Sequence, residues 1–396
     1  MPTDALALRT QALKASPTLA ITAKAKKLRA EGHNVLSLAA GEPDFNTPEP
    51  ICEAAVKAMT DGLTKYTPSA GLPSLREAVS EKLARENGVR VPPEGVVVTC
   101  GAKHAVFGSL MALIAPGDGV TVFAPYWMTY LDQIVLAGGF PVIVEAKPED
   151  GFVPSVQAFE QAITPRTKAV ILNFPCNPTG AAVTREWLGQ AAAIAARHDL
   201  WVLSDEIYEK LVYDGYKPVS VASLSEETAS RTITINGCSK TYAMTGWRIG
   251  YLAAPTRVAQ AVSNLQDQVT SNATSIAQAA AVAALLLPAH IVESMRAEFE
   301  IRRDLMVGLV RDVPGMSCTL PQGAFYVLAN VKQLLTPAID DDCRLATWLL
   351  EKAQVATVPG SVFGAPGTLR LSFACSQEQI RDAMARIREA LCNLPH

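Results

Sequence analysis

The sequence predicts an α/β fold with a mostly parallel sheet packed between helices. Two observations support this prediction: short, continuously apolar, β-rich runs recur between residues 95 and 253, and helix-like stretches separate them. A strand that is covered on both faces reads as an unbroken apolar run rather than as an alternating one. Such strands in alternation with helices are typical of a parallel sheet with helices on both sides.

Six runs are expected to be strands of this sheet: residues 95–99, 119–123, 169–173, 201–204, 232–236 and 249–253. A helix is expected at 103–114, and the Pro-Gly-Asp turn at 116–118 precedes the second strand. Ligands of such sheets bind beyond the carboxyl ends of the strands. Polar, aromatic or glycine residues follow five of the runs, so we expect the functional site at residues 100–103, 124–127, 174–180, 205–208 and 237–240.

The two ends of the chain differ from this pattern. Residues 1–48 are helix-like and then irregular, whereas the C-terminal part mixes strands at 324–328 and 369–373 with helices at 344–352 and 377–391. We expect residues 49–300 to form a large domain, and residues 1–48 and 301–396 to form a smaller α+β domain together.

The composition excludes several classes of protein. Among 396 residues, 35 Lys and Arg nearly balance 38 Asp and Glu, and this balance leaves no basic stripe for nucleic acid. No apolar run reaches membrane-spanning length, and the first ten residues lack the pattern of a secretory signal. The eight cysteines form no CxxC pair, which favours reduced thiols over disulfides or a zinc site. We therefore expect a soluble, cytoplasmic protein without a metal site, a membrane or nucleic acid as partner.

Lys240 is the first candidate for chemistry, because it follows the expected strand at 232–236. Desolvation in a cleft favours the neutral amine of a lysine, which is the nucleophile that forms a Schiff base. Arg248 lies eight residues later and offers a fork that matches a phosphate, although a structural ion pair is an equally ordinary role.

Asp205 ends another expected strand and is the second candidate. A carboxylate there can pair with the protonated ring nitrogen of an electron-sink cofactor, or it can cap a helix. The Gly101-Ala102-Lys103 turn lets backbone N–H groups at a helix start approach a phosphate, which is a weak signal by itself.

Two further side chains offer contacts for oxygen atoms of a ligand. Asn177, in an Asn-Pro-Thr-Gly sequence, can donate to a ring or carboxylate oxygen, or it can belong to a plain turn. Arg370, in the expected strand at 369–373, can hold a carboxylate or form a salt bridge.

Together these motifs resemble the class I, fold-type I aminotransferases that depend on pyridoxal 5′-phosphate. The resemblance runs from about residue 16 to residue 391 and rests on the segments 41–45, 177–180, 204–208 and 239–250 in this order. Within the family, the chain resembles the bacterial aspartate aminotransferases, some of which also transaminate prephenate. Cys176 departs from the pattern, because the family commonly has an asparagine there.

The resemblance implies pyridoxal 5′-phosphate as the cofactor and Lys240 as the residue that binds it covalently and then moves the substrate α-proton. It implies an ionic contact of Asp205 with the pyridinium nitrogen and a phosphate site at Arg248. The other implied cofactor contacts are hydrogen bonds of Tyr208 and Asn177 to the phenolic oxygen, stacking of Trp127 on the ring, and phosphate binding by the backbone amides of Gly101, Ala102 and Lys103.

The resemblance also implies the substrate site and a homodimer. Tyr66 is similar to the tyrosine that reaches a phosphate in the neighbouring subunit, so each active site would be composite. The implied α-carboxylate site consists of Arg370, Trp127, Asn177 and the backbone at Gly41.

Substrate preference follows from Lys103, which resembles the lysine that holds the distal carboxylate of aspartate or glutamate. The expected partners are acidic amino acids with 2-oxoglutarate or oxaloacetate. Lys14 and Thr18 resemble the N-terminal segment of members that accept prephenate. The alternatives on this scaffold are an aromatic aminotransferase and a cysteine-conjugate β-lyase. A DNA-binding regulator is disfavoured, because too few residues precede the match for a helix-turn-helix module.

Overall fold

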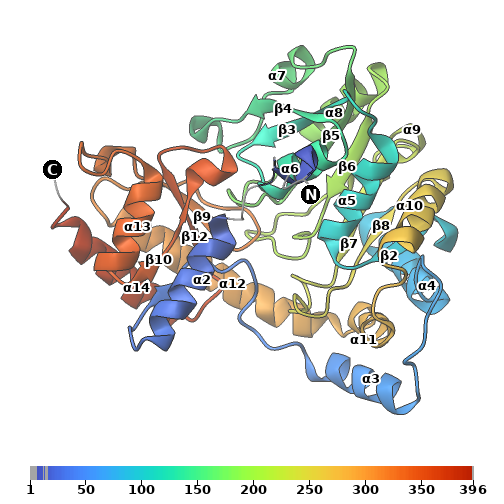
Figure 1. Cartoon of the computed structure of the whole chain (residues 1–396), viewed down its shortest axis with the longest axis horizontal. Helices are drawn as coiled ribbons and strands as arrows, with labels where there is room; N and C mark the ends of the chain where they lie inside the picture. Colours follow the sequence, from blue (N-terminus) through green and yellow to red (C-terminus); the bar gives the residue numbers. More distant parts are fainter. Residues whose placement is uncertain (1–6, 12, 14–16, 395–396) are drawn as a thin grey trace, which may run out of the picture.

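The computed structural model describes residues 7–11, 13 and 17–394 and contains a central sheet between helices (Figure 1). In this described part of the chain, seven strands form the sheet in the order β2-β8-β7-β6-β5-β3-β4. β8 runs antiparallel to β2 and β7, whereas the pairs from β7 to β4 are parallel. The predicted mostly parallel α/β fold is therefore confirmed. The strand bounds are Val96–Thr99 (β2), Gly119–Ala124 (β3), Phe140–Glu145 (β4), Thr167–Asn173 (β5), Trp201–Asp205 (β6), Thr232–Gly237 (β7) and Gly250–Ala253 (β8).

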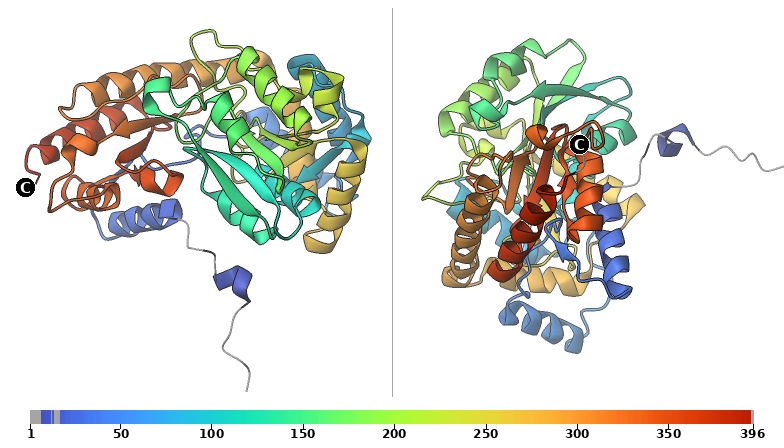
Figure 2. Two further views of the ribbon diagram at one scale, coloured as in Figure 1. Left: turned by 90° about the horizontal axis from the view of Figure 1, so that it is seen from above. Right: turned by 90° about the vertical axis from the view of Figure 1, so that its left-hand side faces the viewer.

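Helices cover both faces of this sheet (Figure 2). Val97 points towards the layer of α5, α6 and α10, whereas its neighbours Val96 and Val98 point towards α3, α4 and α11. Because successive side chains of a strand point to opposite faces, both faces need apolar residues, which explains the unbroken apolar runs. The helix bounds are Glu49–Thr60 (α3), Pro73–Lys82 (α4), Ala102–Leu113 (α5), Thr129–Leu136 (α6), Val156–Gln161 (α7), Arg185–Arg197 (α8), Glu226–Ala229 (α9), Thr256–Val269 (α10) and Ser275–Leu285 (α11).

A smaller antiparallel sheet with the order β11-β12-β9 lies beside the large one. The parallel pairing of β1 with β10, and the packing of α2 against β10, bring the N-terminal residues to the C-terminal part (Figure 1). The bounds are Leu8–Gln11 (α1), Pro17–Ala30 (α2), Leu36–Ser37 (β1), Ala289–Arg311 (α12), Tyr326–Asn330 (β9), Asp342–Lys352 (α13), Val355–Ala356 (β10), Val358–Pro359 (β11), Thr368–Ser372 (β12) and Gln377–Leu391 (α14).

Several strands differ from the sequence expectation. The two-residue strands β1, β10 and β11 were not expected, because two residues carry no pattern. β4 was not expected, and Pro141 at its second position explains both the omission and its place at the sheet edge, where a missing N–H donor is tolerated. The strand expected at 324–328 starts later, at Tyr326. Ala324 has a φ of 56°, a left-handed conformation that does not fit an extended strand.

The expected boundary between the domains, residue 300, lies inside α12. We propose that residues 49–300 and the two segments 1–48 and 301–396 act as a large and a small domain that this helix connects. Among the described residues, no single helix is long and apolar enough to cross a membrane; α11 and α12 meet that criterion only as a pair bent by 87°.

Candidate active site

The carboxyl ends of β5, β6 and β7 and the N-terminus of α5 surround a cavity of about 560 Å³. Chain segments from both sheets meet there, because β9 and β12 of the smaller sheet contribute a tyrosine and an arginine. Most of the site residues expected from the sequence line this cavity: Gly41, Ala102, Lys103, Trp127, Asn177, Asp205, Tyr208, Lys240, Arg248 and Arg370.

Four expected residues lie elsewhere or cannot be placed. Gly101 is the N-cap residue of α5 and is not among the residues that line the cavity. Tyr66 is 91% exposed and does not line the cavity of its own chain. Lys14 lies outside the described residues. Thr18 lies in α2, but the structure describes only its backbone and not its side chain.

Lys240 follows β7 and donates from Nζ to the backbone oxygen of Gly41 at 2.6 Å. Desolvation lowers its pKa to about 8, with Arg370 and Arg248 acting in the same direction and Glu42 opposing them. A lysine with this pKa has an appreciable neutral fraction near neutral pH, and the neutral amine is the nucleophilic form.

Asp205 ends β6 and is 4% exposed. Its Oδ2 accepts a hydrogen bond from Tyr130 Oη at 2.6 Å, and its Oδ1 accepts one from the Ile207 N–H at 3.3 Å. Burial raises the pKa of Asp205 to about 6, although the bond from Tyr130 lowers it. A buried carboxylate of this kind gains from a cationic partner, because an unpaired charge is costly away from water.

The N-terminus of α5 and Arg248 lie side by side at one end of the cavity. Gly101 has a φ of 85°, and a Cβ there would collide with the Arg248 guanidinium, so glycine is required on two counts. Arg248 donates to the backbone oxygens of Thr245 and Cys100, and no carboxylate among the described residues pairs with it. A guanidinium without a carboxylate partner beside a helix N-terminus is suited to bind an anion.

Arg370 in β12 is 3% exposed and also has no carboxylate partner among the described residues. It donates to Asn177 Oδ1 at 3.0 Å and to the Ala39 oxygen at 3.1 Å, while its Nε is without a hydrogen-bond partner. A buried cation with an unused donor favours a bound anion over the alternative of a structural salt bridge.

Lys103 lies in the first turn of α5, and its Nζ sits 4.9 Å from the centre of the Trp127 ring. Desolvation lowers its pKa, and Arg248 adds to this effect, whereas Asp132 opposes it. Lys103 is therefore a further cation of this cavity, besides Arg248 and Arg370, whose charge a ligand can compensate.

Comparison with known proteins decides the family. The model of the aminotransferases of class I and II matches residues 33–387. The chain belongs to this family. It is 48% identical over 386 residues to an aspartate aminotransferase of Geobacillus stearothermophilus, a match that covers 96% of this chain and 98% of that one. It is 45% identical over 392 residues to an aspartate/prephenate aminotransferase of Thermus thermophilus, with 98% of both chains covered.

Solved structures agree with this assignment. The aspartate aminotransferase of Thermus thermophilus with maleate superimposes with a TM-score of 0.94 at 44% identity, covering 98% of this chain and all of that one. The enzyme of Rhizobium meliloti gives a TM-score of 0.95 at 40% identity, covering 99% of this chain and all of that one.

Two tyrosines of this aminotransferase were missed by sequence reasoning. Tyr130 in α6 binds Asp205, and Tyr326 in β9 places its Oη 3.1 Å from Tyr208 Oη. Neither residue follows a strand of the large sheet directly, so the strand-end rule did not select it. Tyr130 could have been selected from the sequence, because it lies in the first turn of the helix that follows β3.

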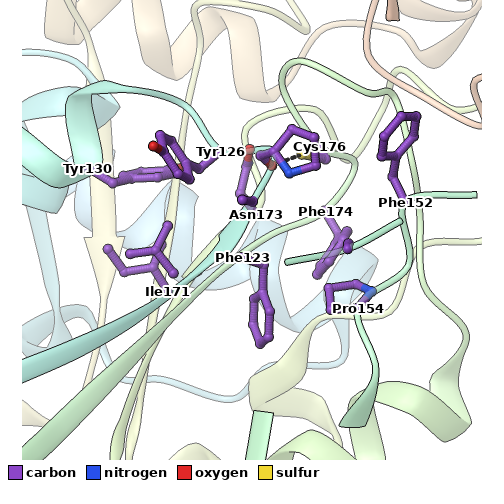
Figure 3. Close-up of a pocket in the computed structure, with 13 residues that line it drawn as sticks. Phe123, Tyr126, Tyr130, Phe152, Pro154, Ile171, Asn173, Phe174 and Cys176 are labelled. Carbon is purple, nitrogen blue, oxygen red and sulfur yellow. Dashed lines mark hydrogen bonds between the residues drawn. The ribbon is translucent and has the colours of Figure 1, made fainter. Parts of the chain in front are cut away.

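Cys176, the departure from the family pattern, lines a second cavity of only about 20 Å³ beside Tyr130 and Asn173 (Figure 3). Its thiol points to the backbone oxygen of Pro125, with a distance of 3.5 Å. Burial raises the pKa of Cys176 to about 11, so the thiol of this aminotransferase stays protonated and weakly nucleophilic near neutral pH.

Glu206 provides a prediction about the pH dependence of stability. It accepts bonds from Ser204 and Ser220, both at 2.8 Å, while burial and the charge of Glu209 raise its pKa to about 7. The folded aminotransferase therefore holds this proton more tightly than the unfolded chain, and stability falls as pH rises from about 4.5 to 7.

Replacing Glu206 by Gln removes this pH-dependent contribution to the free energy of unfolding. We expect the free energy of unfolding of Glu206→Gln, relative to the unaltered protein, to rise between pH 5 and 7 by about 1–3 kcal/mol and to stay constant above. Denaturant titrations at each pH measure it. The exposed Glu227→Gln is the control, and a difference that is flat with pH would contradict the assignment.

Proposed function

We propose that this protein is an aspartate aminotransferase that moves the amino group between aspartate or glutamate and a 2-oxo acid, with pyridoxal 5′-phosphate as cofactor. The observation that carries this proposal is one cavity lined by Lys240, Asp205, Arg370 and Lys103. The names of the relatives from Geobacillus and Thermus support it.

The residues present fit pyridoxal 5′-phosphate. Asp205 would hold the ring nitrogen, Arg248 and the amides of residues 101–103 the phosphate, and Lys240 the aldehyde carbon. Asn177 and Tyr208 would contact the ring oxygen, and Trp127 the ring face. When bound, this cofactor supplies an electron sink that weakens the Cα–H bond of an amino acid.

The side chains of the protein do the remaining work. Asp205 would stay ionised beside a cationic ring nitrogen, and the bond from Tyr130 orients its carboxylate. The Lys240 amine, with its pKa lowered to about 8, would accept the proton from the substrate Cα and would then donate it to the carbon of the cofactor to which the amino group is transferred. Burial of Arg370 excludes water from the carboxylate that it binds.

Substrate choice rests on the distribution of cations. Arg370 binds the α-carboxylate that every amino acid carries, whereas Lys103 remains for a second carboxylate on the side chain. Aspartate, glutamate and their 2-oxo acids meet both requirements. The relatives named aspartate/prephenate aminotransferase extend the proposal to prephenate as an acceptor, a dicarboxylic acid as well.

We also propose a cytoplasmic homodimer with shared active sites. Tyr66 projects from the chain, and a groove of about 470 Å³ lies beside Arg248, lined by Thr47, Trp247 and Ile276. The Tyr66 of a second copy would enter this groove and reach the phosphate site. Exposed apolar residues near Tyr66 or at the ends of neighbouring helices would be covered at the same time: Val56, Met59, Val269 and Leu286.

The test is a panel of amino donors added singly to the purified protein with pyridoxal 5′-phosphate, followed by absorbance. We expect aspartate and glutamate to convert the cofactor to its amino form, and 2-oxoglutarate, oxaloacetate or prephenate to reverse the change. Release of pyruvate and ammonia from cystathionine, without conversion by acidic donors, would favour the β-lyase and contradict the proposal.

The role of Lys103 is tested separately by Lys103→Met. We expect kcat/KM for aspartate to fall by about 10- to 100-fold relative to kcat/KM for alanine, because a desolvated charge pair is lost. Lys27→Met is the matched control, because Lys27 is exposed and lies near Glu31 on α2. An equal loss for both donors would show that Lys103 does not bind the side-chain carboxylate.

A further inference from the structure

Two buried tyrosines share a hydrogen bond inside the candidate active site. Tyr208 follows β6, Tyr326 lies in β9, and their hydroxyl oxygens are 3.1 Å apart. Both residues line the cavity and are nearly inaccessible to solvent. No other hydrogen bond of either hydroxyl is present among the described residues. The pair therefore connects the two sheets at the cavity itself.

The position of Tyr326 is fixed from several sides. In the β9–β12 ladder, Ser372 pairs with Tyr326 and Arg370 with Leu328, so Arg370 and Tyr326 are diagonal neighbours on one face. The Arg370 guanidinium lies 4.4 Å from the centre of the Tyr326 ring. Gly41 borders the Tyr326 hydroxyl, since a Cβ at this position would lie in ordinary contact with it, 3.6 Å away.

The number of protons on the two hydroxyls determines which tyrosine donates in the hydrogen bond between them. A phenol carries one proton and two acceptor lone pairs. If Tyr208 donates its proton to the ring oxygen of the cofactor, Tyr326 is left as the donor between the two tyrosines. The more acidic phenol is the better donor, and burial raises the pKa of Tyr208 further than that of Tyr326, which favours this direction.

We propose that Tyr326 is a positioning residue that donates to Tyr208 Oη and so directs the single proton of Tyr208 to the ring oxygen of the bound cofactor. This inference rests on the proposed function. Hydrogen bonds in a chain polarise one another, so the bond from Tyr326 strengthens the one that Tyr208 donates. A stronger bond to the ring oxygen favours its ionised form.

The charged and titratable groups around the two tyrosines come from four elements. The charge of Arg370 of β12 acts on both hydroxyls, that of Asp205 at the end of β6 on Tyr208, and that of Glu42 after β1 on Tyr326. Lys240 after β7 bears the nitrogen that competes with the ring oxygen for one proton. Tyr326→Phe leaves all these groups in place and removes a single hydroxyl.

The experiment follows the visible absorbance of the cofactor-loaded protein as a function of pH. For Tyr326→Phe we expect the midpoint of this titration to rise by about half a pH unit, because the ring oxygen loses part of its stabilisation. Tyr208→Phe should give a larger rise. Adding Tyr326→Phe to Tyr208→Phe should give no further shift, because the two residues act in series.

Tyr213→Phe is the matched control. Tyr213 is another buried tyrosine of the same hydrophobic cluster, but its hydroxyl donates to the Ala324 backbone oxygen and not to Tyr208. We expect its titration to match that of the unaltered protein, even if its thermal stability falls. An unchanged midpoint for Tyr326→Phe, or an equal shift in the Tyr208→Phe background, would overturn the inference.

The experiment distinguishes a wrong role of Tyr326 from a wrong proposed function. If the unaltered protein develops no visible absorbance with pyridoxal 5′-phosphate, the cofactor assignment is wrong and the tyrosine pair has nothing to act on. If it loads and titrates normally but Tyr326→Phe behaves like Tyr213→Phe, only the role of Tyr326 is wrong.

Discussion

Lys240→Ala is expected to reduce kcat for transamination by about 10⁴-fold or more, because one side chain supplies both the covalent attachment and the proton transfer. The lowered pKa of about 8 makes Lys240 suited to both tasks, and no other lysine of the cavity lies at the end of β7. Steady-state turnover of aspartate with 2-oxoglutarate measures the loss, and mass spectrometry after borohydride reduction measures the attachment.

Two further variants make this result specific. Lys24→Ala removes an exposed lysine that pairs with Glu351 on the surface, and it should leave kcat unchanged. Lys240→Arg keeps the positive charge but cannot serve as a neutral nucleophile, so it should be as inactive as Lys240→Ala. Near-normal turnover in either Lys240 variant would refute the assignment of this residue.

Asp205→Asn should lower kcat by roughly 10²- to 10³-fold and weaken cofactor binding. The substitution keeps the shape of the side chain but removes one member of a buried charge pair, for which losses of about 2–5 kcal/mol are typical. Each 1.4 kcal/mol in the barrier corresponds to a tenfold change in rate. Because Tyr130 donates to the same carboxylate, Tyr130→Phe should produce a smaller loss in the same direction.

The measurement combines kcat with the Kd of pyridoxal 5′-phosphate from fluorescence titration. Asp199→Asn is the control, since this aspartate is 91% exposed at its side chain and pairs with Arg231 at the surface. In the described part of the chain no helix directly follows Asp205, which excludes the helix cap considered from the sequence. If Asp205→Asn retained both kcat and cofactor affinity, Asp205 would only shape the turn after β6, through the bond from the Ile207 N–H.

The sequence predicted those parts of the site that local pattern determines. Asp205 and Lys240 follow apolar runs, and the place of a strand end is visible in one dimension. Tyr326 became significant only through β12, which brings Arg370 to its ring from a distant part of the chain. Such partners depend on tertiary pairing, and no periodicity in the sequence reports them.

The edge strand β4 is a part of the fold that the local sequence pattern did not predict. Its apolar content resembles that of β3, but Pro141 and its partly exposed residues carry the signal of an edge, which pattern analysis discounts. Ala324 is a second case, because its left-handed backbone depends on the turn that leads into β9 and not on any preference of alanine.

The pairing of β1 with β10 has a consequence for the order of folding. Leu36 leaves the ribosome long before its partner Val355, because most of the described chain lies between them. The strands of the large sheet can assemble before β10 is available to pair with β1. Closing so long a loop is entropically slow, so the apolar residues of α2 and β1 stay accessible to chaperones until Val355 has been synthesised.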